Sequence, residues 1–420
     1  MSTQIKEGVR LHIFPSQKFK TVHIRFFFKE ALELEALSSR SLLANIMDIS
    51  TKKYPTQKKL GEALSDLYGA YFNSTASRLG QANIFEFNFV FPNNKYLPAG
   101  EDMRAKNLEL MEEVLFNPIT ENDHFVEKIF NREKKNLIEE YDSISDNKQL
   151  FAALRLNQLY YSDPAYQIPS MGRRKELEEV TPRSLFESYQ KMIENNQVDI
   201  LVMGDVCEEE ILEDIQKLPF TDRSNQVEQI LYVPEHKEDL VVSSDIQDVQ
   251  QAKFNLAYKT NVYYLQEDYF PGLVFNGLFG GFPHSKLFMN VREKESLAYY
   301  ASSSLATMTG KLTVQTGIDG ATRNKTNRII QDQLKAIQDG DFTDDDFHQT
   351  IMGLTNGRYQ SEDSPGAYLK RAYNDIVVQN ELVSLDQWLN RLEEVSKEEV
   401  VRVAQETQLK ASYLLQGAEK

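Results

Sequence analysis

The sequence repeats itself, because the signals for helices and strands in its second half follow the same order as those in its first half. Three pairs of segments match in order, at offsets of 223, 215 and 213 residues: Thr120 with Thr343, Val180 with Val395, and Gly204 with Gly417. Ordered matches at a nearly constant offset indicate a tandem duplication of one structural unit. A chain of 420 residues is also long enough for two such domains.

Each copy mixes short strands with helices. In the first copy, apolar patterning predicts strands at 9–14, 21–29, 70–78, 83–91 and 199–205. The second copy has strands predicted at 252–260, 302–308, 312–317 and 412–417. Because successive strands form hairpin-like pairs instead of alternating strictly with helices, the pattern favours an α+β fold with largely antiparallel sheets over a doubly wound fold.

Capping residues mark where helices start. Thr181, followed by a proline, is the expected N-cap of one helix in the first copy. Residues 119–125 are expected to begin a long helix, with Thr120 and Asp123 at capping-box spacing. That helix is expected to run past Glu140.

The boundary between the two copies is expected in a charged stretch without apolar periodicity. We therefore predict an N-terminal domain at 1–225, a linker at 226–245 and a C-terminal domain at 246–420.

Composition excludes several classes of function. The formal charge of −16 argues against nucleic acid and anionic membranes as partners. No apolar run is long enough for a transmembrane helix, and the N-terminus lacks the pattern of a signal peptide. The single cysteine, Cys207, cannot form an intrachain disulfide, which is typical of a reducing compartment. We therefore expect a cytoplasmic bacterial protein.

Residues 276–300 combine a glycine cluster with an amphipathic run. Three glycines fall within five residues: Gly277, Gly280 and Gly281. An apolar helical face follows, made by Leu287, Phe288 and Val291. Arg292 and Tyr299 then supply a cation and a phenol seven residues apart. Taken alone, the segment is most simply a glycine-tolerant turn, a short core helix and a surface arginine.

The motif Leu287-Phe-Met-Asn-Val-Arg-Glu-Lys-Glu-Ser-Leu-Ala-Tyr299, in the second copy of a duplicated α+β domain, resembles the pitrilysin family of zinc peptidases. The similarity extends over essentially the whole chain, and the helix at 131–140 adds to it. The two-domain branch of that family, which contains the mitochondrial processing peptidase subunits, is the most similar.

Active members of that family bind zinc through an inverted H-x-x-E-H helix in the first domain and a distant glutamate. At the matching positions this chain has Arg40 for the first histidine, Leu43 for the general base and Ala44 for the second histidine. Only the distant glutamate persists, as Glu140, and we interpret it as a solvated acid. No two of the six histidines lie within five residues of each other, so no alignment register gives a zinc helix: His12, His23, His124, His236, His284 and His348. We expect no metal in this chain.

The resemblance implies that an arginine and a tyrosine in the second domain bind the substrate backbone and help to stabilise the oxyanion. Arg292 and Tyr299 match that pair, while Tyr300 fits the tyrosine role less well. Guanidinium and phenol donors suit carbonyl oxygens and developing negative charge. The same resemblance assigns Gly280 and Gly281 to substrate binding.

The leading hypothesis from the sequence is a zinc-less subunit of a heterodimeric peptidase. Arg292 and Tyr299 would act in trans, with zinc and H-x-x-E-H on a partner subunit and a peptide as substrate. Without such a partner, the chain could form a homodimer.

Two alternatives remain open at this stage. The first is a non-catalytic pseudopeptidase that binds peptides as a scaffold or accessory factor in a modification or maturation pathway. The second is an enzyme with different chemistry, although the sequence contains no catalytic triad pattern, P-loop or dinucleotide fingerprint.

Overall fold

A computed structural model describes residues 2–98, 102–224, 227–236 and 238–418. The described residues form two compact units. Unit 1 contains 1–142, 169–228 and 365–373, and unit 2 contains 143–168, 229–364 and 374–420. Residues 225, 226 and 237, at or near the expected domain boundary, lie outside the described ranges.

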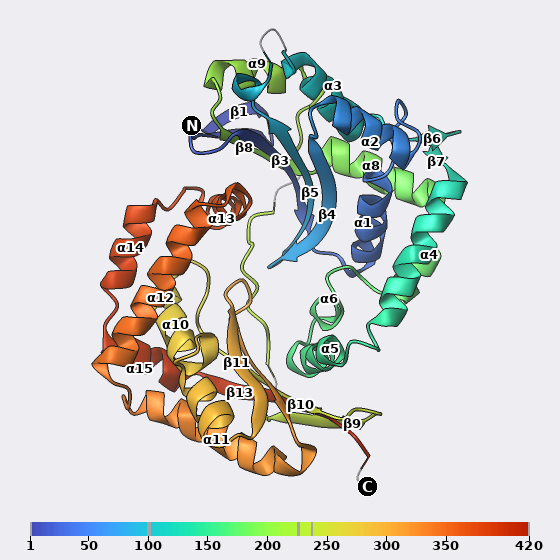
Figure 1. The fold of residues 1–420 in the computed structure, drawn as a ribbon. Helices are drawn as coiled ribbons and strands as arrows, with labels where there is room; N and C mark the ends of the chain where they lie inside the picture. The colour runs from blue at the N-terminus through green and yellow to red at the C-terminus, as the bar shows by residue number, and fades with distance from the viewer. Residues whose placement is uncertain (1, 99–101, 225–226, 237, 419–420) are drawn as a thin grey trace. The chain divides into compact units, whose positions relative to one another are not determined.

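Unit 1 is built on a six-stranded sheet with the order β1-β2-β8-β3-β5-β4 (Figure 1). Its strands are β1 (Ser2–Lys6), β2 (Val9–Pro15), β3 (Thr21–Ala31), β4 (Tyr71–Leu79), β5 (Ala82–Pro92) and β8 (Gln197–Gly204). Only the pairing of β2 with β8 is parallel. The sheet is therefore largely antiparallel, as the hairpin-like pattern of the sequence predicts.

The aromatic run of β3 explains why both faces of this sheet are covered. Phe26 and Phe28 are buried on one face, where both pack against Phe220. Phe27 lies on the other face and stacks on Tyr373 with ring centroids 4.0 Å apart. Since neighbouring residues of a strand point to opposite faces, a continuous aromatic run requires a layer on each side.

The helices of unit 1 lie around this sheet, with α1 packed against β4 and β5. They are α1 (Leu34–Met47), α2 (Gln57–Asp66), α3 (Arg104–Phe116), α4 (Glu127–Ser143), α7 (Arg174–Glu179), α8 (Pro182–Asn195) and α9 (Glu208–Lys217), with a 3₁₀ turn, η1, at Asn94–Tyr96. The predicted start of α8 is confirmed, because the Thr181 side chain accepts a hydrogen bond from the Ser184 backbone N–H.

The predicted helix start at residues 119–125 is wrong. These residues form a small hairpin of β6 (Thr120–Glu121) and β7 (His124–Phe125), and α4 begins only at Glu127. Asn122 and Asp123 form the turn with φ angles of +50° and +59°. Asn and Asp tolerate this left-handed conformation better than most residues, so a tight hairpin competes successfully with a helix cap.

Unit 2 contains a five-stranded sheet with the order β11-β12-β10-β13-β9. Its strands are β9 (Val241–Ile246), β10 (Ala252–Lys259), β11 (Ala298–Ala306), β12 (Lys311–Ile318) and β13 (Gln408–Gln416). Only β9 and β13 pair in parallel. Strand β9 occupies residues that the sequence pattern places mostly in a linker.

The helical segments of unit 2 pack around its sheet, and the core on one face of the sheet includes Phe254, Leu256 and Leu414. These segments are α5 (Lys148–Tyr160), α6 (Pro164–Gln167), α10 (Tyr269–Asn276), α11 (Arg323–Gln338), α12 (Asp344–Glu362), α14 (Leu385–Glu393) and α15 (Lys397–Glu406), the 3₁₀ turn η4 (Gly320–Thr322), and two π-helical segments, η2 (Gly277–Gly281) and η3 (Phe288–Lys294). Helices α12 and α15 begin with capping boxes at Thr343 and Ser396.

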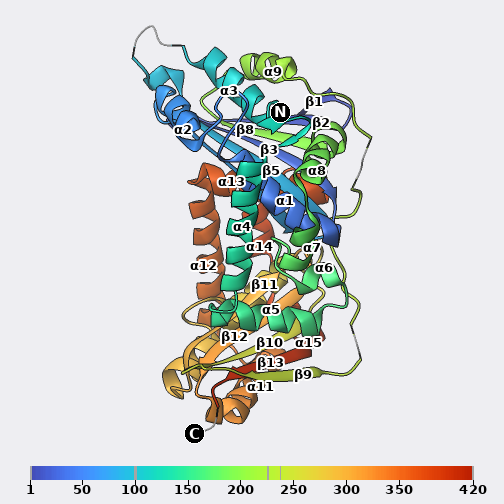
Figure 2. The same ribbon diagram turned by 90° about the vertical axis from the view of Figure 1, so that its right-hand side faces the viewer.

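Helix α5 and residues 365–373 each belong to the unit formed mainly by the other half of the sequence. Helix α5, from the first half, packs against β10 and β13 of unit 2 (Figures 1 and 2). Helix α13 (Pro365–Gln379), from the second half, starts in unit 1, where Tyr368 packs on Phe14 and Tyr373 on Phe27. The expected domain ranges therefore differ from the compact units at 143–168 and 365–373.

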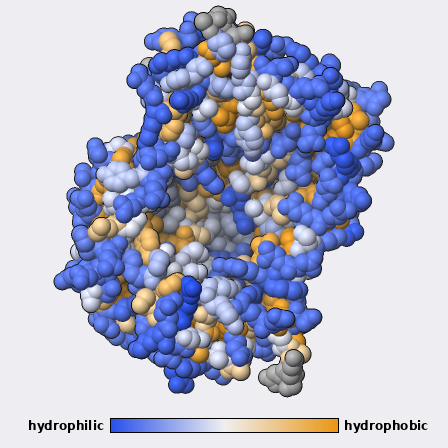
Figure 3. Space-filling model, viewed as in Figure 1, coloured by the Kyte–Doolittle hydropathy of each residue, from blue (hydrophilic) through white to orange (hydrophobic). Residues whose placement is uncertain are grey.

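The tandem duplication and the α+β class are confirmed. The first residues of α4 and α12, and of α5 and α13, are separated by the same 217 residues. The face of the molecule in Figure 3 is mainly hydrophilic. Across the described ranges, every helix is too short or too polar to cross a membrane.

Candidate functional site

Helix α1 carries the three positions that align with the family's zinc helix. Leu43 is fully buried and Ala44 is 5% exposed, so both side chains belong to the core of unit 1. Ser38, earlier in α1, donates a hydrogen bond to the carbonyl oxygen of Arg173 and accepts one from its N–H. Positions 43 and 44 are therefore closed by core packing.

Arg40 is buried as an ion pair. Its side chain is only 2% exposed, and its guanidinium forms a bidentate contact with Glu30 at the end of β3. The Nε to Oε1 distance is 2.6 Å. Among the described residues, its third nitrogen, Nη1, has no hydrogen-bond partner. A cation fixed in this way neutralises a buried carboxylate.

These residues do not fit a zinc ion. Zinc requires deprotonated sulfur, imidazole or carboxylate ligands, whereas α1 offers one guanidinium and two hydrocarbon side chains. Glu140 is exposed on α4, next to Tyr141, whose hydroxyl donates to the Met171 carbonyl. Nowhere in the described ranges do three or more His, Cys, Asp or Glu side chains form a group that could hold a metal ion.

The second set of predicted residues lies in unit 2, where the glycine cluster forms η2 and Arg292 lies on η3. Gly280 is buried against β11, and a Cβ atom there would lie 2.5 Å from the Ser303 backbone nitrogen. Glycine is thus required for the close approach of η2 to the strand. Gly281 is exposed. Close packing against β11 therefore explains why residue 280 is a glycine, without any role in substrate binding.

Arg292 lies in the last turn of η3 with 43% of its side chain exposed. Its guanidinium carbon lies 4.5 Å from the centre of the Phe288 ring, and its Nε lies 3.5 Å from Glu293 Oε1. Leu287 and Val291 are fully buried and anchor the segment. A cation stacked on an aromatic ring keeps its N–H groups available at the ring's edge.

Tyr299 is the most exposed large hydrophobic side chain in the described part of the molecule, at 76%. It lies in β11, the edge strand of the sheet, between the paired residues Ala298 and Tyr300, where the register with β12 shifts. A β-bulge at an edge redirects a side chain and is common beside functional sites. Segment η3 packs directly against β11, so Arg292 and Tyr299 come from adjoining elements.

Tyr300 is held differently from Tyr299. It is opposite Gly317 in β12, where a Cβ atom would lie 2.4 Å from the Tyr300 ring. Lys253 Nζ lies 5.3 Å from the ring centre, and burial raises the pKa of the phenol. Its hydroxyl is buried without a hydrogen-bond partner among the described residues. Tyr299 is consequently the phenol that is open to a ligand.

Comparisons with known proteins place the chain in a family. A model of the peptidase M16 inactive domain matches residues 179–354. A Bacillus subtilis protein described as the probable inactive metalloprotease YmfF is 32% identical over 417 residues, covering 98% of this chain and 96% of that protein. The chain belongs to the peptidase M16 family. The resemblance to pitrilysin-type peptidases is thereby confirmed.

Solved structures agree with this assignment. A conserved protein from Enterococcus faecalis is 38% identical and superposes with a TM-score of 0.94, covering 100% of this chain and 99% of that one. An M16 inactive-domain protein from Pseudomonas fluorescens has a TM-score of 0.82 at 16% identity, covering 100% and 98%. The second similarity shows the M16 fold alone.

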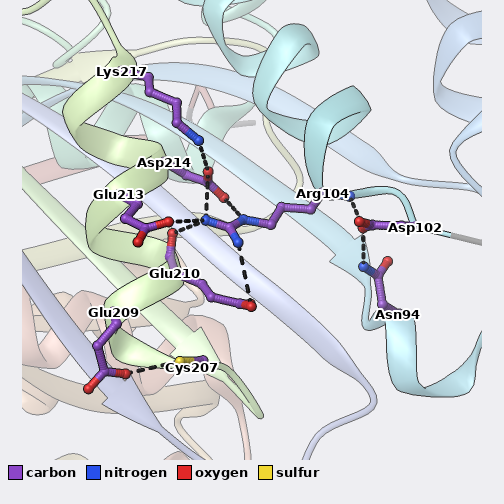
Figure 4. A network of polar contacts seen from close by, with 9 residues as sticks. All are labelled: Asn94, Asp102, Arg104, Cys207, Glu209, Glu210, Glu213, Asp214 and Lys217. Atoms are coloured by element: carbon purple, nitrogen blue, oxygen red, sulfur yellow. Dashed lines mark hydrogen bonds and ion pairs between the residues drawn. The ribbon is translucent and has the colours of Figure 1, made fainter.

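A further polar cluster in unit 1 of this M16 protein adjoins a small cavity of about 160 Å³. Figure 4 shows the contacts of this cluster. Arg104 of α3 binds both carboxylate oxygens of Asp214 and the backbone oxygen of Glu210 on α9. Cys207 lines the same cavity, and its thiol is 3.0 Å from a Glu209 oxygen. Arg104 joins α3 to α9, which supports a structural interpretation for this arginine. Cys207 is exposed and contacts only Glu209 of α9 in Figure 4.

Sequence reasoning missed two features of the candidate site. The first is Glu30, whose pairing with Arg40 crosses a turn between a strand and a helix. The second is the pair of π-helical segments, η2 and η3, which lie on either side of residues 282–287. Such segments are rare and often occur at functional sites. A glycine-rich run next to an amphipathic run was the only signal available for them.

Proposed function

We propose that this chain is the zinc-less subunit of a two-chain M16 peptidase, and that Arg292 and Tyr299 bind the substrate backbone at a metal site on the partner. The observation that carries the proposal is the contrast between α1 and unit 2. Positions 40, 43 and 44 are closed by an ion pair and core packing, whereas Arg292 and Tyr299 remain exposed on adjoining elements.

The chemistry of the exposed pair supports substrate binding. Arg292 keeps donors open to solvent although its guanidinium stacks on Phe288. Tyr299 presents a phenol from a bulged edge strand. Together they offer N–H and O–H donors to a peptide carbonyl oxygen and to negative charge that develops on it, which is the role of an oxyanion-binding pair.

The test is to combine this chain with an H-x-x-E-H-containing M16 subunit from the same organism and to measure cleavage of a fluorogenic peptide library. Neither chain alone should cleave efficiently, and the mixture should. Arg292→Ala should then lower kcat/KM about 10²- to 10³-fold, as loss of an oxyanion donor does. Tyr299→Phe should lower kcat more than it raises KM.

Matched controls come from the same segment. Lys294→Ala removes an exposed cation, and Tyr300→Phe removes the buried hydroxyl, so neither should change cleavage more than about twofold. Size-exclusion chromatography of each mixture shows whether the complex is intact. Equal cleavage with Arg292→Ala would refute the shared site. No cleavage by an intact complex would favour the pseudopeptidase scaffold.

A further inference from the structure

The two sheets differ at one edge. Strand β9 pairs in parallel with β13 just as β2 pairs in parallel with β8, so β9 is the counterpart of β2 in the duplicated fold. In unit 1 the outer edge of β2 is paired with β1. In unit 2 β9 is the last strand of the sheet, and no described segment pairs with its outer edge. Strand β2 therefore has an outer neighbour, β1, whereas its counterpart β9 has none among the described residues.

The open edge carries exposed apolar side chains. Val242 is 53% exposed and Ile246 is 67% exposed. Ser244 lies between them on the same face of the strand. It is opposite Leu414 of β13, which belongs to the buried core. Val242, Ser244 and Ile246 thus extend the helix-covered face of the sheet beyond the core of unit 2.

The other face of β9 is occupied. Asp245 accepts a hydrogen bond from the Tyr413 hydroxyl at 2.8 Å and one from Arg155 of α5 at 3.0 Å. The only charged side chain of the strand is therefore neutralised on the face away from Val242 and Ile246. Strand β9 also lacks lysine and proline, which natural edge strands use to prevent pairing with other chains.

The sequence of β9 is complementary to itself. In an antiparallel pair, opposed residues lie on the same face. If a two-fold axis passes through Ser244, Val242 of one copy is opposite Ile246 of the other, on both sides of the axis. Ser243 is then opposite Asp245, and a hydroxyl can donate to a carboxylate there. One symmetric register thus pairs the two exposed apolar residues with each other.

We propose that β9 pairs with β9 of a second copy of this chain, antiparallel and in the register that opposes Val242 and Ile246. The pairing gives the open edge the antiparallel neighbour that β1 gives to β2. A pair of six-residue strands buries less than the roughly 1,600 Å² of a standard interface, so the dimer is weak and depends on concentration. The proposal does not depend on Arg292 or Tyr299.

Disulfide trapping of the full-length chain tests the register. The background is Cys207→Ser, which removes the single native cysteine. Opposed residues of an antiparallel pair have Cα atoms about 4.5–5.5 Å apart, within disulfide reach. Ser244→Cys should therefore form a covalent dimer with itself under mild oxidation. Val242→Cys mixed with Ile246→Cys should cross-link, while Val242→Cys alone should not, because those two residues lie about 13 Å apart along the strands.

Ser243→Cys is the matched control, one residue away on the opposite face. It should cross-link at least tenfold more slowly than Ser244→Cys. Faster trapping of Ser243→Cys would overturn the proposed register, and no trapping of either variant would overturn the dimer.

Sedimentation of the chain without new cysteines provides an independent measurement. The wild-type chain should show a concentration-dependent dimer, which Val242→Lys/Ile246→Lys should abolish by opposing like charges twice. Met352→Lys/Leu382→Lys adds the same charge at exposed apolar positions elsewhere in unit 2 and should leave the dimer unchanged. Equal dimerisation of both double variants, or none in the wild-type chain, would contradict the proposal.

Discussion

At the scale of single residues, the difference between this chain and a zinc peptidase is a replacement of ligands by core packing. Arg40 neutralises the charge of Glu30 in an ion pair, and the side chains of Leu43 and Ala44 pack in the core of unit 1. Periodicity alone predicts that Leu43 is buried. The partner of Arg40 could not be predicted, because the pairing depends on how β3 and α1 meet in three dimensions.

Arg40→Met should destabilise the chain by about 3–5 kcal/mol, because it leaves Glu30 charged and nearly buried. Urea unfolding followed by circular dichroism measures the change. Arg174→Met is the matched control, since its ion pair with Glu178 is half exposed and should contribute less than about 1 kcal/mol. Similar small losses in both variants would show that the Arg40 pair is dispensable.

Asp48, just after α1, gives a pH-dependent prediction. Burial raises the pKa of its carboxyl from 3.8 to about 6, although the Ser74 N–H and hydroxyl donate to it. The folded state therefore binds this proton more tightly than the unfolded state does, and the contribution to stability falls as the pH rises from about 4 to 6.

Asp48→Asn removes that proton equilibrium and keeps an acceptor for Ser74. The variant should gain stability relative to wild type as the pH rises through this window, by on the order of 2 kcal/mol at pH 7. Thermal unfolding at several pH values measures the difference. A difference that does not change between pH 4 and pH 7 would mean that Asp48 titrates normally.

At the scale of elements, most helices and strands could be predicted, because apolar spacing and caps are local signals. The hairpin of β6 and β7 could not. Thr120 and Asp123 have the spacing of a capping box, but the left-handed Asn122 and Asp123 close a turn instead. Strand β9 was also missed, since six residues with a partly exposed alternation resemble a polar linker.

Asp123→Gly distinguishes the hairpin from a helix cap. Glycine adopts a φ of +59° without strain, so the variant should be more stable by roughly 0.5–1 kcal/mol. If residues 120–123 were a capping box, the same change would remove a cap and destabilise the chain. Chemical denaturation gives the sign directly.

Helix α1 should not accept a rebuilt zinc motif. The variant Arg40→His/Leu43→Glu/Ala44→His restores H-x-x-E-H in letters, but it places a carboxylate at a fully buried position and leaves Glu30 unpaired. It should lose several kcal/mol of stability and bind no stoichiometric zinc. Metal analysis after dialysis and a denaturation curve check both results. A folded variant with one zinc per chain would show that α1 still lies in an open site.

At the scale of the whole molecule, the duplication and the M16 fold could be predicted, but the exchange of α5 and α13 could not. Local sequence shows that each segment is an amphipathic helix and does not show which sheet it covers. Because unit 1 needs 365–373 and unit 2 needs 143–168, neither half of the sequence contains a complete unit.

Separately produced fragments 1–228 and 229–420 should therefore fail to unfold cooperatively, while their coexpression should restore a folded assembly. Scanning calorimetry of each fragment and of the coexpressed pair makes the comparison. A fragment that melts cooperatively by itself would show that the exchanged helices are not needed for folding.

The central claim is that this chain supplies Arg292 and Tyr299 to a site whose metal is held by another chain. Purification of the native complex from its own cells through a tag on this chain, followed by partner sequencing and metal analysis, tests it most directly. We predict an M16 partner with H-x-x-E-H and one zinc per pair of chains. A purified native assembly without an H-x-x-E-H chain would contradict the claim.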